Sequence, residues 1–198
     1  MKILAAIAVL LLAGMTPAFA QGWHDRQGNP IAETSATKSV EGFAGMLVVT
    51  PDADWQEKWN TPAEDIPHFT EASEVRLGGK LQVLIFFSNP LLDADRLADV
   101  TCDLEVIRPD GSKGVDQQDI ECYQGPIPND PANLYMAKPS LQFIAEAGDL
   151  PGEWTMRVTL RDNHRGVGMI LEKKVALVVG GNAPKPPAGD PSGARETS

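Results

Sequence analysis

A period-two alternation of apolar and polar residues is the feature that most limits the fold of this chain. In Glu153–Arg161, EWTMRVTLR, every second residue from Trp154 to Leu160 is apolar, and the residues between them are polar or charged. At the 3.6-residue period of a helix the same apolar side chains would be scattered around the axis. The segment is therefore predicted to be a β-strand with one buried face.

Other segments carry related patterns. Met169–Val179 alternates in the same way, although Lys173 interrupts its apolar row, which indicates a bulge or a sheet edge. Lys80–Phe87 ends apolar on both faces, as expected of a central strand whose second half is covered. Phe43–Thr50 and Leu141–Ala145 are further strand candidates. With frequent Pro and Gly between them, these segments predict an all-β, two-sheet antiparallel sandwich, with a closed barrel as the alternative.

The two ends of the chain differ from this central part. Residues 1–20 combine one lysine, an apolar run and small residues before Gln21, which is the pattern of a cleaved signal peptide. The apolar run is too short to span a bilayer comfortably, so we expect a periplasmic or secreted protein whose mature chain does not insert into a membrane. Residues 180–198 are rich in Gly, Pro and Ala and are predicted to be a disordered tail. Residues 21–179 suffice for one domain with its own core.

The charge of the chain limits its partners. The net charge is −10, and removal of residues 1–20 takes away one lysine and makes it −11. No basic run and no alternation of basic and aromatic residues offsets this acidity. Because nucleic acid and anionic lipid would both be repelled, we expect neither as a partner.

Only two cysteines occur, Cys102 and Cys122, on either side of a Pro-Asp-Gly turn. If the flanking runs form a hairpin with the cysteines directly opposite each other, Leu104, Val106 and Ile120 share their face, so the apolar register and the disulfide register agree. An oxidising compartment favours the bond, and closing this loop contributes about 3 kcal/mol in the chain-entropy model. A zinc site would need four ligands and a redox dithiol a Cys-x-x-Cys motif, so a structural disulfide is predicted.

The same hairpin register would gather carboxylates on the outer face. Asp103 would lie opposite Glu121 and Glu105 opposite Asp119. Like charges directly across a ladder cost about 0.2–1 kcal/mol per pair. Either this is a solvated face, or it is an acidic ridge that receives a cation such as Ca²⁺ or a basic patch of a partner. No glycine-bearing ligand loop accompanies these residues, so they are weak candidates for metal ligands.

The segment Gly148–Trp154, GDLPGEW, enters its strand through an acidic, glycine-containing corner and resembles a recurring part of bacterial immunoglobulin-like domains. The resemblance implies an immunoglobulin-like sandwich whose final hairpin joins Trp154–Leu160 to Leu171–Val179. Trp154 would stand where such domains more often carry Tyr. The chain departs from the pattern at its cysteines, which are too close in sequence to join strands of opposite sheets.

Residues 21–74 have no counterpart in a minimal seven-strand domain of this kind. We expect residues 75–179 to form the sandwich, and residues 21–74 to form an extension with one strand and short helical turns, packed on it. Asp54–Glu57 and Thr61–Glu64 both carry helix-start signatures.

Two tryptophans follow the first of these helix starts. Trp55 and Trp59 are four residues apart and would share one side of a helical turn. Either they plug one end of the sandwich, or they form a stacking platform for a sugar or an apolar peptide.

Motifs of enzyme chemistry are absent from the sequence. There is no nucleophile elbow, P-loop or dinucleotide fingerprint, and we predict no cofactor and no catalytic residue. The three histidines, His24, His68 and His164, lie far apart in unlike contexts. His24 would complete an amino-terminal copper(II) site only if Gln21 were also removed.

These observations predict an exported, non-catalytic binding or accessory protein of the bacterial cell envelope, which meets an envelope protein or a small ligand. The alternatives are a hydrolase or metal-dependent enzyme, in which His68 or His164 would converge with carboxylates, and a purely structural envelope domain. The candidate surfaces are the Trp55 and Trp59 region, the loop at residues 162–168 and the acidic face of the hairpin. No particular oligomeric state is predicted.

Overall fold

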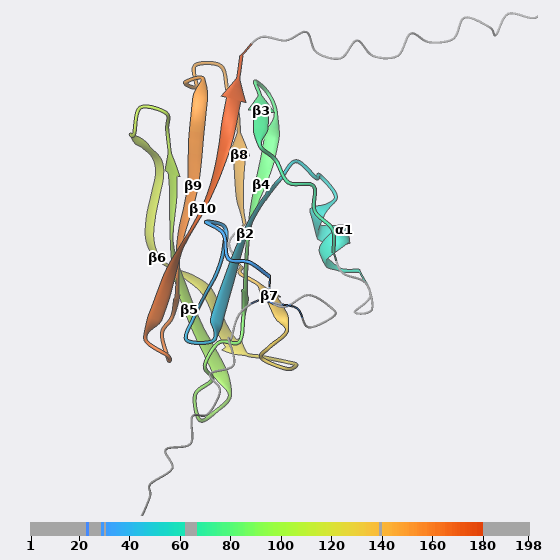
Figure 1. The fold of residues 1–198 in the computed structure, drawn as a ribbon, viewed down its shortest axis with the longest axis vertical. Coiled ribbons are helices and arrows are strands. Elements are labelled where there is room, and N and C mark those ends of the chain that lie inside the picture. The colour runs from blue at the N-terminus through green and yellow to red at the C-terminus, as the bar shows by residue number, and fades with distance from the viewer. Residues whose placement is uncertain (1–22, 24–28, 30, 62–66, 139, 180–198) are drawn as a thin grey trace, which may run out of the picture.

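A computed structural model describes residues 23, 29, 31–61, 67–138 and 140–179. The expected signal peptide and tail, most of the second helix signature and His24 lie outside these residues. The described part contains two β-sheets that face each other and one short helix (Figure 1). None of the described helices is long and apolar enough to cross a membrane.

All five segments predicted to be strands are strands, and the two-sheet, all-β sandwich is confirmed for the described residues. Neighbouring strands are antiparallel, except that β3 runs parallel to β10. The first sheet has the order β1 (Thr37–Val40), β2 (Phe43–Thr50), β4 (Lys80–Ser88) and β7 (Leu134–Met136), and β8 (Leu141–Ile144) also pairs with β4. The second sheet has the order β3 (Glu74–Arg76), β10 (Val167–Val178), β9 (Gly152–Asp162), β5 (Leu97–Ile107) and β6 (Lys113–Pro126).

The core lies between the sheets and is made by the inward residues of β2, β4, β5, β9 and β10. Gly45 of β2 lies close to side chains of the second sheet, because a Cβ atom there would lie 2.8 Å from Met169 Sδ. The same atom would lie 3.0 and 3.1 Å from side-chain carbons of Leu160 and Leu171. A larger residue at this position would therefore force these side chains to move.

Strand β4 is apolar on both faces because both faces are covered. Its inward residues, such as Ile85 and Phe87, belong to the main core. Its outward residues Leu84 and Phe86 are also buried, in a second and smaller apolar cluster. The prediction of a central strand with a covered second half is confirmed.

Lys173 marks an edge and not a bulge. The register between β9 and β10 is continuous, and Lys173 lies opposite the inward residue Met156. Strand β3 pairs with β10 only at Ala176–Val178, so among the described strands none flanks this side of β10 at Lys173. The ammonium group reaches the carboxylate of Glu71 at the rim of the sandwich.

The Cys102–Cys122 disulfide is present, with the two Cα atoms 5.8 Å apart. The predicted register of its hairpin is wrong, because Cys102 lies opposite Ile120. Val100 pairs with Tyr123 and Thr101 with Glu121, so Cys122 is the extra residue of a β-bulge. This bulge changes which residues of β5 and β6 lie opposite each other further along the hairpin.

The shifted register also separates the carboxylate pairs that were expected on the outer face. Glu121 lies opposite Thr101 and not Asp103, and Glu105 lies opposite Asp116 and not Asp119. Asp119 has a φ of 54° within the second irregularity of this ladder. A left-handed residue of this kind cannot be read from apolar periodicity.

The stretch at residues 21–74 contributes to both sheets, where one strand was expected. It supplies β1 and β2 to the first sheet and the first residue of β3 to the second. Strand β2 pairs with β4 from Ala44 to Thr50. Between β2 and β3 lies the helix α1 (Trp55–Trp59), on the outer side of the first sheet (Figure 1). Asp54 precedes α1 but forms no side-chain capping hydrogen bond.

Candidate functional surfaces

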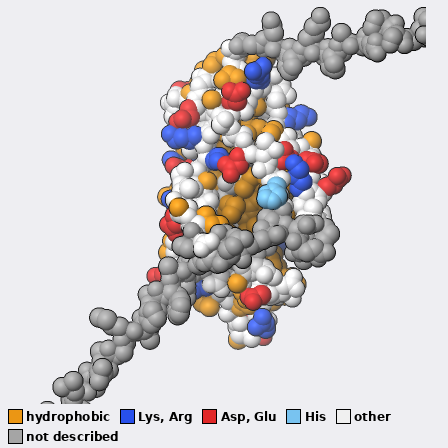
Figure 2. Space-filling model, turned by 45° about the vertical axis from the view of Figure 1, so that its right-hand side comes forward, with side chains coloured by type: hydrophobic (Ala, Val, Ile, Leu, Met, Phe, Trp, Pro, Cys, Tyr) orange, Lys and Arg blue, Asp and Glu red, His pale blue; other side chains and the backbone are white. Residues whose placement is uncertain are grey.

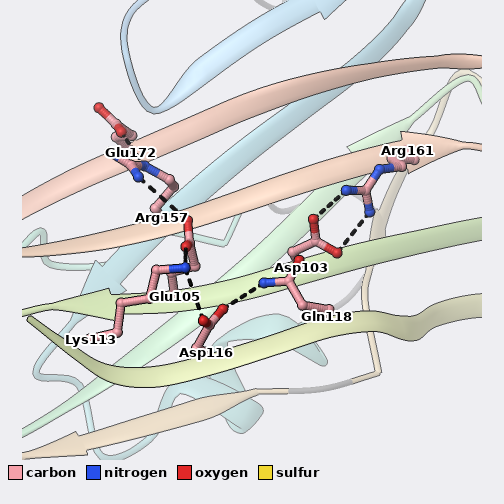
Figure 3. A network of polar contacts seen from close by, with 8 residues as sticks. All are labelled: Asp103, Glu105, Lys113, Asp116, Gln118, Arg157, Arg161 and Glu172. Carbon is pink, nitrogen blue, oxygen red and sulfur yellow. Dashed lines mark hydrogen bonds and ion pairs between the residues drawn. The ribbon is translucent and has the colours of Figure 1, made fainter.

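Side chains from four strands form a charge network on the outer face of the second sheet (Figure 3). Glu105 of β5 forms ion pairs with Lys113 of β6 and with Arg157 of β9, the latter at 3.4 Å. The Nε of Arg157 donates a hydrogen bond of 2.5 Å to Glu172 of β10. Opposite charges therefore alternate across the strands, an arrangement that stabilises a sheet face.

Asp103 has its own set of partners in this network. The guanidinium of Arg161 donates two hydrogen bonds to its carboxylate, of which the Nη1–Oδ1 bond is 2.9 Å. The backbone N–H of Asp119 donates a third, also at 2.9 Å. The hydrogen bonds from Arg161 lower the pKa of Asp103 more than its burial raises it.

Two further carboxylates of the hairpin form ion pairs. Asp116 lies 2.9 Å from the ammonium of Lys113, whose hydrogen bond is the main cause of its lowered pKa, and Glu121 lies 2.7 Å from Lys138. No three His, Cys, Asp or Glu side chains within the described ranges are grouped so that they could hold a metal ion. The face carries mixed charge. Arg157 and Arg161 were missed as partners, although they alternate on the polar face of a predicted strand.

The outer face of the first sheet is apolar by contrast. At its centre the buried side chains belong to β2 and β4, and six partly buried side chains pack around them. We call this cluster the apolar patch, and it consists of Val48, Leu84 and Phe86 with Met46, Trp55, Trp59, Phe69, Leu134 and Met136.

Trp55 and Trp59 lie together in this patch, both half-buried. The ring centroid of Trp59 is 5.1 Å from that of Phe86, and the ring of Phe69 is 5.8 Å from Phe86 on the same face. The two tryptophans therefore pack on the face of a sheet and not at an end of the sandwich. Figure 2 shows hydrophobic side chains gathered in a hollow on this side of the molecule. Phe69 and the methionines were missed because the sequence does not reveal which strands are neighbours.

Asp52 connects the helix α1 with the segment that follows it. Its Oδ2 lies 2.7 Å from Nζ of Lys58 in the helix and accepts a 2.8 Å hydrogen bond from the N–H of Thr70 beyond it. Burial alone would raise the pKa of Asp52, but these hydrogen bonds, led by that from Lys58, lower it to about 2. Asp52 is thus ionised at neutral pH and holds the covering segment in place.

The candidate loop at residues 162–168 is occupied by structural contacts. The buried carboxylate of Asp162 accepts hydrogen bonds from the N–H of Leu91, at 2.7 Å, and from Arg165. Arg165 also donates to the backbone oxygens of Glu41 and Asn89, both at 2.9 Å. This ion pair joins three turns at one end of the sandwich.

The two described histidines do not assemble a site. His68 and His164 are both exposed. Neither belongs to a group of described residues that could bind a metal ion.

No protein-family model matches the chain, and no curated protein matches it in sequence. Solved structures with a partial likeness include a family 123 glycoside hydrolase from Clostridium perfringens, with 8% identity, a TM-score of 0.38, and coverage of 68% of this chain and 27% of the hydrolase. A CARDB domain from Pyrococcus furiosus, solved in complex with di-metal ions, has 6% identity, a TM-score of 0.38 and coverage of 75% and 99%. A Niemann-Pick type C2 protein from the Japanese carpenter ant has 8% identity, a TM-score of 0.35 and coverage of 67% and 89%.

Proposed function

We propose that this chain is an exported, non-catalytic binding or accessory protein of the bacterial cell envelope, and that it binds an apolar peptide segment of a protein partner on the apolar patch. The observation that carries this proposal is the partial exposure of six apolar side chains, three of them aromatic, on one sheet face. Contiguous apolar surface of this kind marks interaction sites in proteins that are otherwise soluble. Large aromatic residues that remain partly exposed serve as anchors in such interfaces.

The surroundings of the patch favour a peptide over a sugar as the ligand. A sugar site needs free polar groups beside the aromatic rings. Here the ammonium of Lys58 is already paired with Asp52 at 2.7 Å and with Asp54 at 3.4 Å. Met46 and Met136, at the edge of the patch, have flexible side chains that adapt to varied apolar partners.

We also infer an immunoglobulin-like topology, for which the strand order is the support. In such sandwiches the last two strands pair with each other and with an earlier strand, which a further edge strand can extend. The order β10, β9, β5, β6 follows this pattern. The indole N–H of Trp154 donates a 2.9 Å hydrogen bond to the oxygen of Leu150, four residues upstream, as the corner tyrosine of these domains does through its hydroxyl.

The proposed location is the periplasm or the extracellular space. The Cys102–Cys122 disulfide supports it, because such bonds persist in oxidising compartments. The leader-like sequence of residues 1–20 supports it independently.

Selection from a phage-displayed peptide library on the purified mature chain tests the proposed function. We expect enrichment of peptides with several apolar residues, and a loss of affinity of at least about thirtyfold in Trp59→Ala, as for a central aromatic anchor. Met136→Lys substitutes no residue of α1 and should also abolish binding, because it places a charge in the patch. Ile170→Ala is the matched control, since Ile170 is 48% exposed on the outer face of the other sheet.

Two results would contradict the proposed function. One is a library that yields no enriched peptide. The other is a set of enriched peptides that bind Trp59→Ala and Met136→Lys as well as they bind the unsubstituted chain.

A further inference from the structure

A second candidate site is an open cavity of about 310 Å³, at the end of the sandwich where the β5–β6 turn lies near β8. Its volume falls at the lower end of the range that holds small ligands. It is separate from the apolar patch and shares no residue with it. The lining residues that matter below are Val106, Arg108, Phe143, Glu146, Asp149 and Trp154.

The apolar wall of the cavity is made of core side chains. Val106, Phe143 and Trp154 are all buried, and the rings of Phe143 and Trp154 lie 5.1 Å apart. The indole N–H of Trp154 is taken by the oxygen of Leu150. The wall is therefore held in place without a ligand, and it offers apolar surface and not hydrogen-bond donors.

Arg108 provides the positive group of the cavity. Its guanidinium carbon lies 5.9 Å from the ring centroid of Trp154, and its Nη1 donates a 2.9 Å hydrogen bond to the oxygen of Lys113. Among the described residues no carboxylate forms an ion pair with Arg108, whereas Arg157, Arg161 and Arg165 each have one. Within the described ranges no residue accepts a hydrogen bond from the Nε or Nη2 of Arg108, and we infer that these donors serve a ligand.

Two carboxylates lie on the loop between β8 and β9 at the same cavity. Oδ2 of Asp149 accepts a 2.8 Å hydrogen bond from the N–H of Glu146, so this carboxylate shapes the loop. The carboxylate of Glu146 is exposed and forms no ion pair with any residue that the structure describes. The cavity thus presents one cation and one anion beside an apolar wall, and neither forms an ion pair with another residue that the structure describes.

We propose that this cavity binds a small zwitterion with an apolar body, which is the chemistry of a free α-amino acid with a large apolar side chain. The carboxylate of the ligand pairs with Arg108, its ammonium group with Glu146, and its side chain packs against Val106, Phe143 and Trp154. A plain anion would be opposed by Glu146, by Asp149 and by the net charge of −10. This site does not depend on the proposed peptide-binding function.

Calorimetric titration with three related compounds tests the assignment. L-Phenylalanine carries both charges, 3-phenylpropionate lacks the ammonium group, and phenethylamine lacks the carboxylate. We expect saturable binding of L-phenylalanine at millimolar concentration or below, and affinity at least about tenfold weaker for each of the other two, since a hydrogen bond to a charged group contributes about 1.5–3 kcal/mol.

Variants separate the two charged contacts. Arg108→Gln should weaken the binding of L-phenylalanine and of 3-phenylpropionate by at least about tenfold. Glu146→Gln should weaken the binding of L-phenylalanine and of phenethylamine by a similar factor. Arg96→Gln, at an exposed arginine in the β4–β5 connection, should change nothing. The proposal is overturned by absence of binding at millimolar L-phenylalanine, by equal binding of either truncated compound, or by unchanged binding in Arg108→Gln and Glu146→Gln.

Discussion

The two sheets of the sandwich turn very different faces to the outside. The outer face of the second sheet carries the charge network, in which acidic and basic side chains from four strands neutralise one another. The outer face of the first sheet carries the apolar patch, to which the five-residue helix α1 and Phe69 contribute partly buried side chains. The charged side chains of one face have their partners within the chain, and the apolar side chains of the other face remain partly exposed.

The two outer faces have different effects on stability and solubility when no other molecule is bound. Ion pairs on an exposed sheet face contribute little to stability, but they keep the surface hydrated and unattractive to other proteins. Aromatic and methionine side chains that remain partly exposed weaken solubility unless something binds them. The proposed binding function concerns the apolar patch, and the charge network has no part in it.

The largest expected effect is that of Phe86→Ala. Phe86 is buried beneath the rings of Trp59 and Phe69, so its removal leaves a cavity and should lower the free energy of unfolding by about 3–5 kcal/mol. Arg157→Ala, on the opposite outer face, should lower it by less than about 1 kcal/mol. Urea denaturation measures both unfolding free energies. Equal losses in Phe86→Ala and Arg157→Ala would contradict the difference described between the two outer faces.

Arg161→Ala should lower the free energy of unfolding by an intermediate amount, about 1–2 kcal/mol. It leaves the buried carboxylate of Asp103 with only the N–H of Asp119 as a donor. Because Arg161 holds the pKa of Asp103 below its usual range, this stabilisation is present above the unfolded-state pKa and is lost as pH falls through the lowered value. The difference in unfolding free energy between the unsubstituted protein and Arg161→Ala should thus shrink in acid. A difference that grows below pH 4 would contradict this assignment.

Acid should also loosen the cover of the apolar patch. The pKa of Asp52 is lowered to about 2 from its ordinary value of 3.8, so its stabilising contribution is complete above about pH 4 and disappears as pH falls through 2. We expect a red shift of tryptophan fluorescence in this interval as Trp55 and Trp59 become more hydrated. The tryptophan fluorescence of Asp52→Asn should be red-shifted already at neutral pH. A spectrum of Asp52→Asn without this shift would show that α1 is held by other contacts.

The smallest expected effect is that of Lys174→Ala. Its ion pair with Glu153 is 2.7 Å long, but both side chains are more than half exposed, at 59% and 60%. Such pairs seldom contribute measurably, so the unfolding midpoint should stay within experimental error of the unsubstituted protein. A clear loss of stability would mean that the charge network extends further than the contacts described above.

The strands could be predicted because alternation is a local property. Glu153–Arg161 and Met169–Val179 lie almost where their patterns placed them, and the apolar second half of Lys80–Phe87 indicated its double cover. The pairing of Cys102 with Cys122 could also be predicted, since they are the only two cysteines in the sequence and they flank a turn.

The register and the makeup of both outer faces could not be predicted in this way. The bulge at Cys122 and the left-handed Asp119 shift the hairpin ladder, and apolar periodicity does not encode either feature. The arginine partners of Asp103 and Glu105 come from β9, more than fifty residues away in sequence. Trp55 and Trp59 were found by their spacing, but the strands beneath them are neighbours only in the folded chain.

Methyl NMR of methionine-labelled protein tests most directly whether the apolar patch is a binding face. Met46 and Met136 lie in the patch, while Met156 and Met169 lie in the core between the sheets. On addition of a library-selected apolar peptide, the methyl signals of Met46 and Met136 should shift progressively and those of Met156 and Met169 should stay in place. Signals of Met46 and Met136 that remain unmoved under saturating peptide would contradict the assignment of this face to partner binding.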